Sequence, residues 1–250
     1  MIKRVFLAAL AAGALAAVFI TAVQAFTTTP IILHAEEYEK GQASSGRSAV
    51  PVILTVFAMP PAASQSSRNG EVLTVQGGAT SKKVWSPGDG IERTLYTGLA
   101  NLLAAVGFAL LIVACFVIHD KPIDARRGVM WGIAGFAIFI LAPSLGLPPE
   151  APGAKAAGLI DRQVWWAFAT AMAALGLWLM VFTRHGALKV LGVIAIAVPH
   201  LVGAPQPAEL GGSVPPEIAG HFAAASIVVN AIFWTSLGWL AGTFYERLSR

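Results

Sequence analysis

The sequence predicts an all-α integral membrane protein: a bundle of about six transmembrane helices with one long irregular periplasmic loop. Composition is the first reason, because 56% of the 250 residues are hydrophobic and only 12% are charged, whereas soluble domains carry about 25% charge. The second is that the apolar residues fall into runs near the length of about 20 residues that crosses a bilayer. The runs cover residues 5–26, 95–118, 128–147, 164–183, 187–203 and 221–245.

The first run could be either a membrane helix or a signal peptide, and the fifth run is short for a membrane span. Residues 1–4 are "MIKR", and "VQA" at 23–25 resembles a signal-peptide cleavage site. The first run is longer than the 7–15 apolar residues typical of a signal peptide, however. We therefore favour a retained first helix, with a cleaved signal peptide as the alternative. The fifth run is the shortest span.

The short loops predict the orientation. With six crossings and a cytoplasmic N-terminus, the inner segments carry most of the basic residues outside the long first loop, as the positive-inside rule requires. Both termini are then cytoplasmic. The basic residues of the inner segments are Lys3, Arg4, Lys121, Arg126, Arg127, Arg184, Lys189, Arg247 and Arg250, and those of the two short outer loops are Lys155 and Arg162.

The long first loop, 27–94, belongs to the same single transmembrane domain, 1–250. Its first part, "TTTPIILHAEEYEKG", has the pattern of a continuation of the first helix. Residues 43–90 are rich in Ser, Gly, Pro and Ala, with one strand-like piece, "EVLTV". Such a composition predicts extended, hairpin-like or irregular structure and not a separate domain.

Small and polar residues inside the runs predict helix packing. Gly128 with Gly132, and Gly238 with Gly242, form GxxxG motifs that let helix backbones approach closely. The single cysteine, Cys115, is expected to be a small buried apolar residue. The polar residues inside the runs are expected to bridge helices, with an ion path as the alternative. They are Asn101, Thr170, Asn230, Thr235 and Ser236.

Two sequence echoes fall at the outer face. "PPEAPG" at 148–153 and "PPEIAG" at 215–220 share the pattern P-P-E-x-x-G, and Pro143 and Pro199 both precede x-Leu near a helix end. Because proline lacks an N–H group, it breaks a helix when it lies in the interior, but it is favourable in the first turn. We expect the fifth helix to end at Pro199, with His200 at its outer mouth. Helix capping alone would explain Glu217 but not Glu150.

The outer face also collects imidazole and carboxylate groups, which suit divalent first-row metals. Any single exposed histidine is more often simply solvated, but convergence of several predicts a collective site. Its expected ligands are His200, Glu217, Glu150, Glu36, Glu39 and His221. His221 follows Glu217 by four residues, so both project from one helix face. The remaining candidates at this face are His34, Glu37, Asp161 and Glu209.

Several function classes lack their motifs. The chain has no GxxxxGK[ST] phosphate loop and no HExxH, GxSxG or GxGxxG motif. No histidine lies near the midpoint of a predicted helix, which argues against haem ligation. The sequence also lacks a basic face with interleaved aromatic residues, so we expect no nucleic-acid partner. We therefore expect neither an enzyme nor a resident cofactor.

The motifs together resemble those of the CbtA family of probable cobalt transporter subunits. The resemblance rests on "AEEYE", "RTLYTGLANLLAAVGFALL", "RRGVMWGIAGFAIFILAPSLGLPPEAPG", "DRQVWWAFATAMAALGL", "PHLVGAPQP" and "VPPEIAGHF". It implies a multi-pass protein of the bacterial inner membrane, Co²⁺ as the transported ion, and a small single-helix CbtB-like partner with a His-rich terminus. The positions that match the shared motifs are Glu36, Tyr38, Glu39, Glu150, His200 and Glu217.

Three functions follow as hypotheses. The first is a divalent-cation (cobalt) transporter subunit that captures metal at the periplasmic His/Glu cluster. The second is a non-transporting structural or assembly membrane protein, whose PPE and GAPQP motifs cap helices and dock a partner. The third, the weakest, is a membrane-bound enzyme with a metal at the outer face.

Overall fold

The computed structural model describes residues 2–43, 87–119, 121–209 and 211–249, and this part of the chain is helical with no strand. The predicted all-α membrane fold is confirmed. The helices are α1 (Ile2–Phe26), α2 (Thr28–Ala43), α3 (Ile91–His119), α4 (Ala125–Phe136), η1 (Ala137–Leu141), α5 (Ala142–Ser144), α6 (Leu159–Phe182), α7 (Gly186–Val202) and α8 (Pro216–Arg247).

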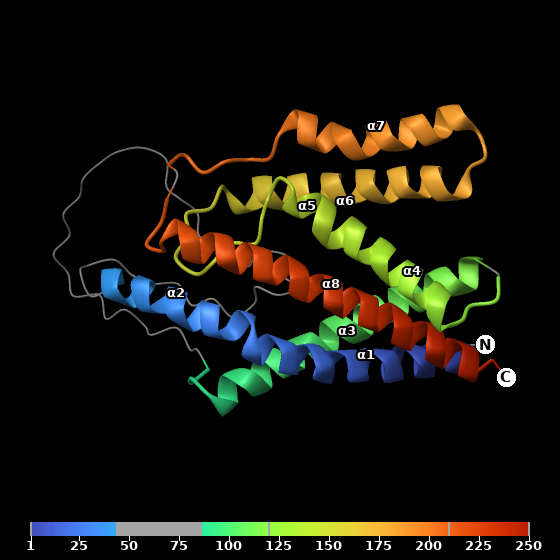
Figure 1. The fold of residues 1–250 in the computed structure, drawn as a ribbon, viewed down its shortest axis with the longest axis horizontal. Helices are drawn as coiled ribbons and strands as arrows, with labels where there is room; N and C mark the ends of the chain where they lie inside the picture. Colours follow the sequence, from blue (N-terminus) through green and yellow to red (C-terminus); the bar gives the residue numbers. More distant parts are fainter. Residues whose placement is uncertain (1, 44–86, 120, 210, 250) are drawn as a thin grey trace.

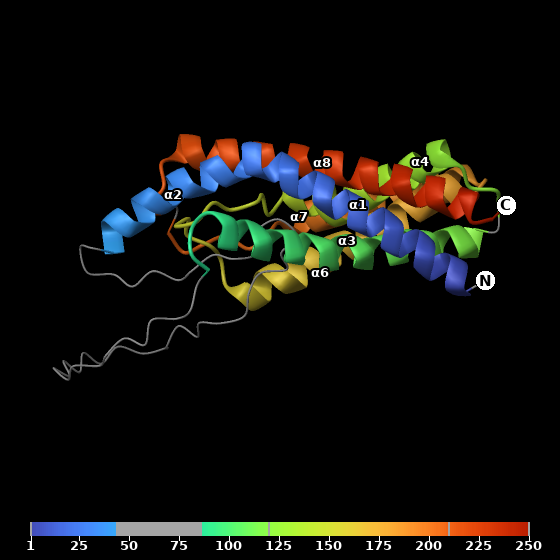
Figure 2. The same ribbon diagram turned by 90° about the horizontal axis from the view of Figure 1, so that it is seen from below.

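The helices form an elongated bundle (Figure 1). Both termini lie at one end, together with the α3–α4 and α6–α7 connections. The opposite end, called the distal end below, carries α2 and the segments 145–158 and 203–215 (Figures 1 and 2). This grouping agrees with the sequence-based topology, in which the same segments share one side of the membrane.

Five helical stretches are long and apolar enough to cross a bilayer: α1, α3, the continuous Ala125–Ser144, α6 and α8. The sixth, α7, has 17 residues and a length of about 26 Å, slightly below the hydrocarbon thickness of about 30 Å. By contrast α8 has 32 residues, or about 48 Å. A helix of that length extends well beyond the hydrocarbon core.

The first helix continues past the predicted span. After a one-residue break at Thr27, α2 starts at Thr28 and carries Pro30 in its first turn, where the missing N–H is tolerated. Figure 2 shows α1 and α2 as a bent rod. The predicted continuation is therefore confirmed, whereas "EVLTV" and most of the 43–90 segment lie outside the described residues.

Two prolines sit inside helices. Pro143 is preceded by the π-helical turn η1, which widens the backbone where the proline ring would meet the carbonyl of Phe139. Pro199 does not end its helix, contrary to the sequence-based expectation. It is buried inside α7, which continues to Val202 and closes at Gly203 with φ of 87°. His200 therefore lies within the last helical turn.

The GxxxG motifs bring α4 and α8 together. A Cβ atom on Gly238 would lie 2.3 Å from the carbonyl oxygen of Gly128, and one on Gly132 would lie 2.2 Å from the carbonyl oxygen of Trp234. The two backbones thus touch, as the motif predicts. A similar approach joins α6 to α7, where a Cβ on Gly176 would lie 2.5 Å from the Gly192 oxygen.

The polar residues in the helices behave in two ways. Asn101 is buried and bridges helices as expected, with its Nδ2 donating to Thr21 Oγ1 at 2.9 Å and to Gln24 Oε1 at 2.7 Å. The expectation is wrong for Thr235 and Ser236, whose hydroxyls donate to carbonyls one turn earlier in their own helix. A hydroxyl satisfied in this way needs no partner helix. Cys115 is a free thiol and only half-buried.

Candidate functional site

The six expected metal ligands all lie on elements at the distal end. Glu36 and Glu39 are on α2, Glu150 follows α5, and His200 is in the last turn of α7. Glu217 and His221 are in the first two turns of α8. The common end follows from the up-and-down order of the helices.

Backbone pairing joins the two Pro-Pro-Glu segments. The Lys155 N–H donates to the Gly211 carbonyl at 3.0 Å, and the Ser213 N–H donates to the Gly153 carbonyl at 3.0 Å. Ala154 and Gly212 form an isolated antiparallel bridge. The segments that carry Glu150 and Glu217 therefore lie side by side.

Apolar side chains lock this arrangement to α2. Ala35, Ala151, Val214 and Phe222 form one buried cluster, with Ile31, Ile32 and Ile218 packed against it. The cluster links α2, both loop segments and α8 in one small core. It positions the backbone from which the polar candidates project.

The sequence echo does not produce two equivalent structures. Gly153 of "PPEAPG" has φ of 80°, a conformation that favours glycine. Gly220 of "PPEIAG" is an ordinary helical residue in open space. Pro215 and Pro216 start α8 as N-cap and first residue, so Glu217 occupies the first turn, where its charge favours the helix dipole.

Glu217 and His221 form the most accessible pair. Both are exposed, and residues four apart on a helix face the same side. Within the described ranges neither side chain makes an ion pair. They are available to an incoming cation without displacing a partner.

The acidic residues of α2 have a different environment. Glu36 accepts two hydrogen bonds from the Arg93 guanidinium, with Nη1 to Oε2 at 3.1 Å, and Arg93 also donates to Asp89. Lys40 Nζ lies 3.9 Å from Glu36 Oε2. Glu39 is half-buried, with its Cβ near Gly153. Burial, and then the Glu36 carboxylate, raise the pKa of Glu39 above its usual value, while Lys40 partly offsets the effect.

Glu150 and His200 lie against α6. Arg162 and Glu150 form an ion pair, with 2.9 Å between Nη2 and Oε2. Burial raises the pKa of Glu150, and the Arg162 charge partly offsets that rise. The His200 ring packs edge-on against Trp165, with 5.9 Å between ring centroids. His200 is thus held by packing within the last turn of α7, and its expected position past the end of the helix is wrong.

The described residues contain no group of three or more His, Cys, Asp and Glu side chains close enough to hold a metal ion. The structure instead places the candidates in separate sets. Glu36 and Glu39 are neighbours on α2, and Glu217 and His221 lie one turn apart on α8. Glu150 and His200 contact different residues of α6, Arg162 and Trp165. Among the remaining candidates, His34 packs against Tyr38 with ring centroids 5.6 Å apart, and Glu209 pairs with Lys155.

Sequence reasoning missed the basic and aromatic partners. Arg93, Arg162 and Trp165 each lie in the first turns of a membrane helix. Interfacial Arg and Trp are common enough to be assigned to membrane anchoring. Only their contacts with Glu36, Glu150 and His200 connect them to the candidate site.

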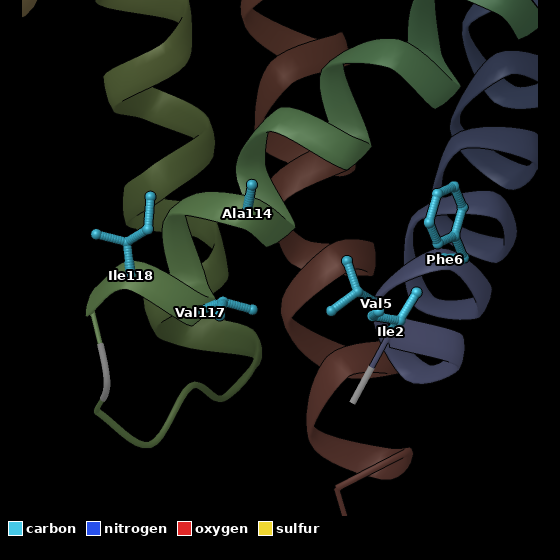
Figure 3. Close-up of a pocket in the computed structure, with 6 residues that line it drawn as sticks. All are labelled: Ile2, Val5, Phe6, Ala114, Val117 and Ile118. Carbon is cyan, nitrogen blue, oxygen red and sulfur yellow. The ribbon is translucent and has the colours of Figure 1, made fainter.

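An apolar groove lies at the other end of the bundle, near the N-terminus. It is lined by Ile2, Val5 and Phe6 of α1 and by Ala114, Val117 and Ile118 of α3 (Figure 3). None of these side chains is a metal ligand. The groove has the chemistry of a lipid-facing surface.

Comparison with known proteins gives one clear result. The family model described as "Probable cobalt transporter subunit (CbtA)" matches residues 2–246, nearly the whole chain. No curated protein and no solved structure matches.

Proposed function

Because this chain belongs to the CbtA family of probable cobalt transporter subunits, we propose that it captures Co²⁺ or a similar divalent cation at its distal end. The distal end is then the periplasmic face of a bacterial inner membrane, and both termini are cytoplasmic. The observation that carries the proposal is the gathering of all six candidate ligands on elements at this end. Imidazole and carboxylate are suitable ligands for such a cation.

Glu217 and His221 are the proposed first contact. Their exposed i, i+4 arrangement offers one carboxylate and one imidazole to an ion that keeps most of its water. A two-ligand site binds weakly enough to release its cargo. Glu39 is the next metal ligand we propose. It is half-buried and lies beside Gly153, which belongs to the segment that pairs with residues 211–213.

Glu36, Glu150 and His200 would join only after rearrangement. Glu36 and Glu150 already neutralise Arg93 and Arg162, so a metal must exchange with a guanidinium at either position. Such an exchange couples capture to movement of α3 or α6. The subunit description implies a partner chain, and a small single-helix CbtB-like protein with a His-rich terminus would supply the missing ligands.

One observation favours the alternative, a structural or assembly protein. Each of these paired carboxylates joins two elements, α2 to α3 and the segment after α5 to α6, which is how an inert scaffold would use them. The Glu217–His221 pair has no such role within the described chain, so it decides between the two functions.

Cobalt uptake tests the proposal. Glu217→Gln and His221→Ala should each lower accumulation of radioactive Co²⁺ by at least about tenfold, the lower end of the loss seen when supporting groups around a metal are removed. Cells should carry this chain with and without its small partner, at equal membrane abundance.

His185→Ala is the matched control, because His185 is exposed at the opposite end and its side chain makes no capping bond. Uptake that is unchanged in both Glu217 and His221 variants would refute capture at this pair. Uptake that never exceeds that of cells lacking the gene would favour the structural alternative.

Cysteine labelling tests the orientation. In a Cys115→Ser background, Ser66→Cys should react with a membrane-impermeant maleimide in intact cells, and Ser249→Cys should react only after lysis. Labelling of Ser249→Cys from outside would reverse the proposed topology and place the candidate residues in the cytoplasm.

A further inference from the structure

The first turns of α6 hold two buried N–H donors that lack an acceptor. Arg162 Nε and Trp165 Nε1 are both buried, and neither has a hydrogen-bond partner among the described residues. The two residues are three apart on one helix, so they face the same side. Buried donors are nearly always paired, and an exception calls for a bound ion, ligand or water.

The surroundings hold the Trp165 ring in place. The residue is 6% exposed, with His200 edge-on at 5.9 Å between centroids. A Cβ on Gly146 would lie 2.3 Å from the ring carbon Cη2, so the loop passes in direct contact with the indole. The indole N–H is therefore positioned before any ligand arrives.

Arg162 keeps donor capacity after pairing with Glu150. The ion pair uses Nη2 at 2.9 Å and leaves Nε unpaired. The indole and guanidinium groups donate but do not accept hydrogen bonds. The complement of this pair must therefore be an acceptor, and a hydrogen bond from a guanidinium N–H is strongest when the acceptor is anionic.

We propose that Arg162 and Trp165, with His200 beside them, bind an anionic oxygen group, a carboxylate or a phosphate, at the distal end of α6 and α7. Such a group would accept a hydrogen bond from Arg162 Nε and from Trp165 Nε1. The group comes either from a free anion, such as a carboxylate chelator of the metal, or from the headgroup of an anionic lipid. The inference goes beyond metal capture and does not depend on it.

Binding to the purified full-length protein tests the site with two conservative variants. Trp165→Phe keeps an aromatic ring against His200 and Gly146 but removes the N–H. Arg162→Lys keeps the charge beside Glu150 but removes Nε. Trp166→Phe is the matched control, since Trp166 packs towards Phe139 at 6.5 Å between centroids.

Radiolabelled citrate and phosphate are measured by equilibrium dialysis in a neutral detergent. Retention of phosphatidylglycerol against phosphatidylcholine is measured by native mass spectrometry. We expect the parent and Trp166→Phe to retain one of these anions, and each site variant to bind it about tenfold more weakly, as expected for loss of a hydrogen bond to a charged group. Citrate or phosphate binding identifies a free anion as the source, and selective phosphatidylglycerol retention identifies lipid.

If the parent binds none of the three anions, or if parent and site variants bind them with equal affinity, the inference is overturned. Water would then be the partner of the two donors. Cobalt uptake measured with the same parent keeps the two proposals apart. Uptake without anion binding contradicts only this site, and anion binding without uptake contradicts only metal capture.

Discussion

The four-helix core and the α6–α7 hairpin are built differently. In the core, α1 packs along α3 and along α8, and α8 packs along α4. Asn101 adds buried hydrogen bonds between α3 and α1. In the hairpin, α7 packs against α6 and has no other described helix in extensive contact. Figure 1 shows the hairpin along one side of the bundle.

Aromatic rings join the hairpin to the core. Phe139 faces Trp166 across η1 and α6 with 6.5 Å between centroids, and Phe182 contacts His119 and Trp131 at 5.6 and 6.2 Å. The Glu150–Arg162 ion pair ties the distal end. Ring contacts tolerate small shifts better than touching backbones do. The hairpin is therefore the region whose displacement disturbs the fold least, and it carries His200 and the proposed anion site.

The largest expected loss of stability comes from adding a methyl group where two core helices touch. Gly238→Ala places Cβ within 3.0 Å of three backbone atoms, the Gly128 oxygen and the Gly132 Cα and N. Backbone cannot rotate away as a side chain can, so the loss of stability should reach or exceed the upper end of the usual about 1–3 kcal/mol for overpacking. The measurement is the folded fraction during titration with a denaturing detergent.

Gly107→Ala is the control for that variant, because nothing lies within 4 Å of its added methyl on α3. It should leave the unfolding midpoint unchanged or slightly raised. If Gly238→Ala were as stable as Gly107→Ala, the α4–α8 contact would be looser than described.

A smaller effect is expected from the same change in the hairpin. Gly176→Ala places Cβ 2.5 Å from the Gly192 oxygen and 2.5 Å from Cγ1 of Ile196. Because α7 packs mainly against α6, it can move outwards, and we expect about 1–2 kcal/mol, within the range for overpacking. Limited proteolysis should show faster cleavage at 183–186 with the core fragment intact.

Gly186→Ala, which meets nothing within 4 Å, is the matched control within the hairpin. A Gly176 variant that destabilises the protein as much as Gly238→Ala would show that hairpin and core unfold together.

The smallest expected effect concerns the ion pair between the two regions. Burial raises the pKa of Glu150, so its carboxylate is harder to ionise in the folded protein than in the unfolded chain. Stability contributed by this group is complete below the unfolded pKa of about 4.3 and is lost as the pH rises through the higher folded pKa.

Glu150→Gln removes this titration while keeping an acceptor for Arg162. The parent should lose stability relative to the variant as the pH rises above the unfolded pKa of about 4.3, as followed by unfolding midpoints at successively higher pH. If the parent instead gains stability relative to Glu150→Gln as the pH rises, the Arg162 charge lowers the pKa of Glu150 more than burial raises it.

Some of the candidate site could be predicted from the sequence. Counting the helices along the chain is enough to place Glu150, His200 and Glu217 at the same end of the bundle. Helix geometry alone places Glu217 and His221, four residues apart, on one helix face. The ion pairs were not predictable, because Arg93 lies 57 residues from Glu36, and Arg162 is separated from Glu150 by a loop whose path depends on Gly153. Pairing over such distances depends on which helix faces meet.

By itself the sequence determined the all-α membrane class and the order of the apolar helices along the chain. These depend on local quantities, namely the length of an apolar run, its flanking charges and the missing N–H of proline at Pro216. Only the tertiary structure decided that Pro199 stays inside α7, that Thr235 bonds within its own helix, and that Gly153 and Gly220 differ despite the same motif. The physical reason is that burial and backbone approach are set by neighbouring helices, which no single stretch of sequence contains.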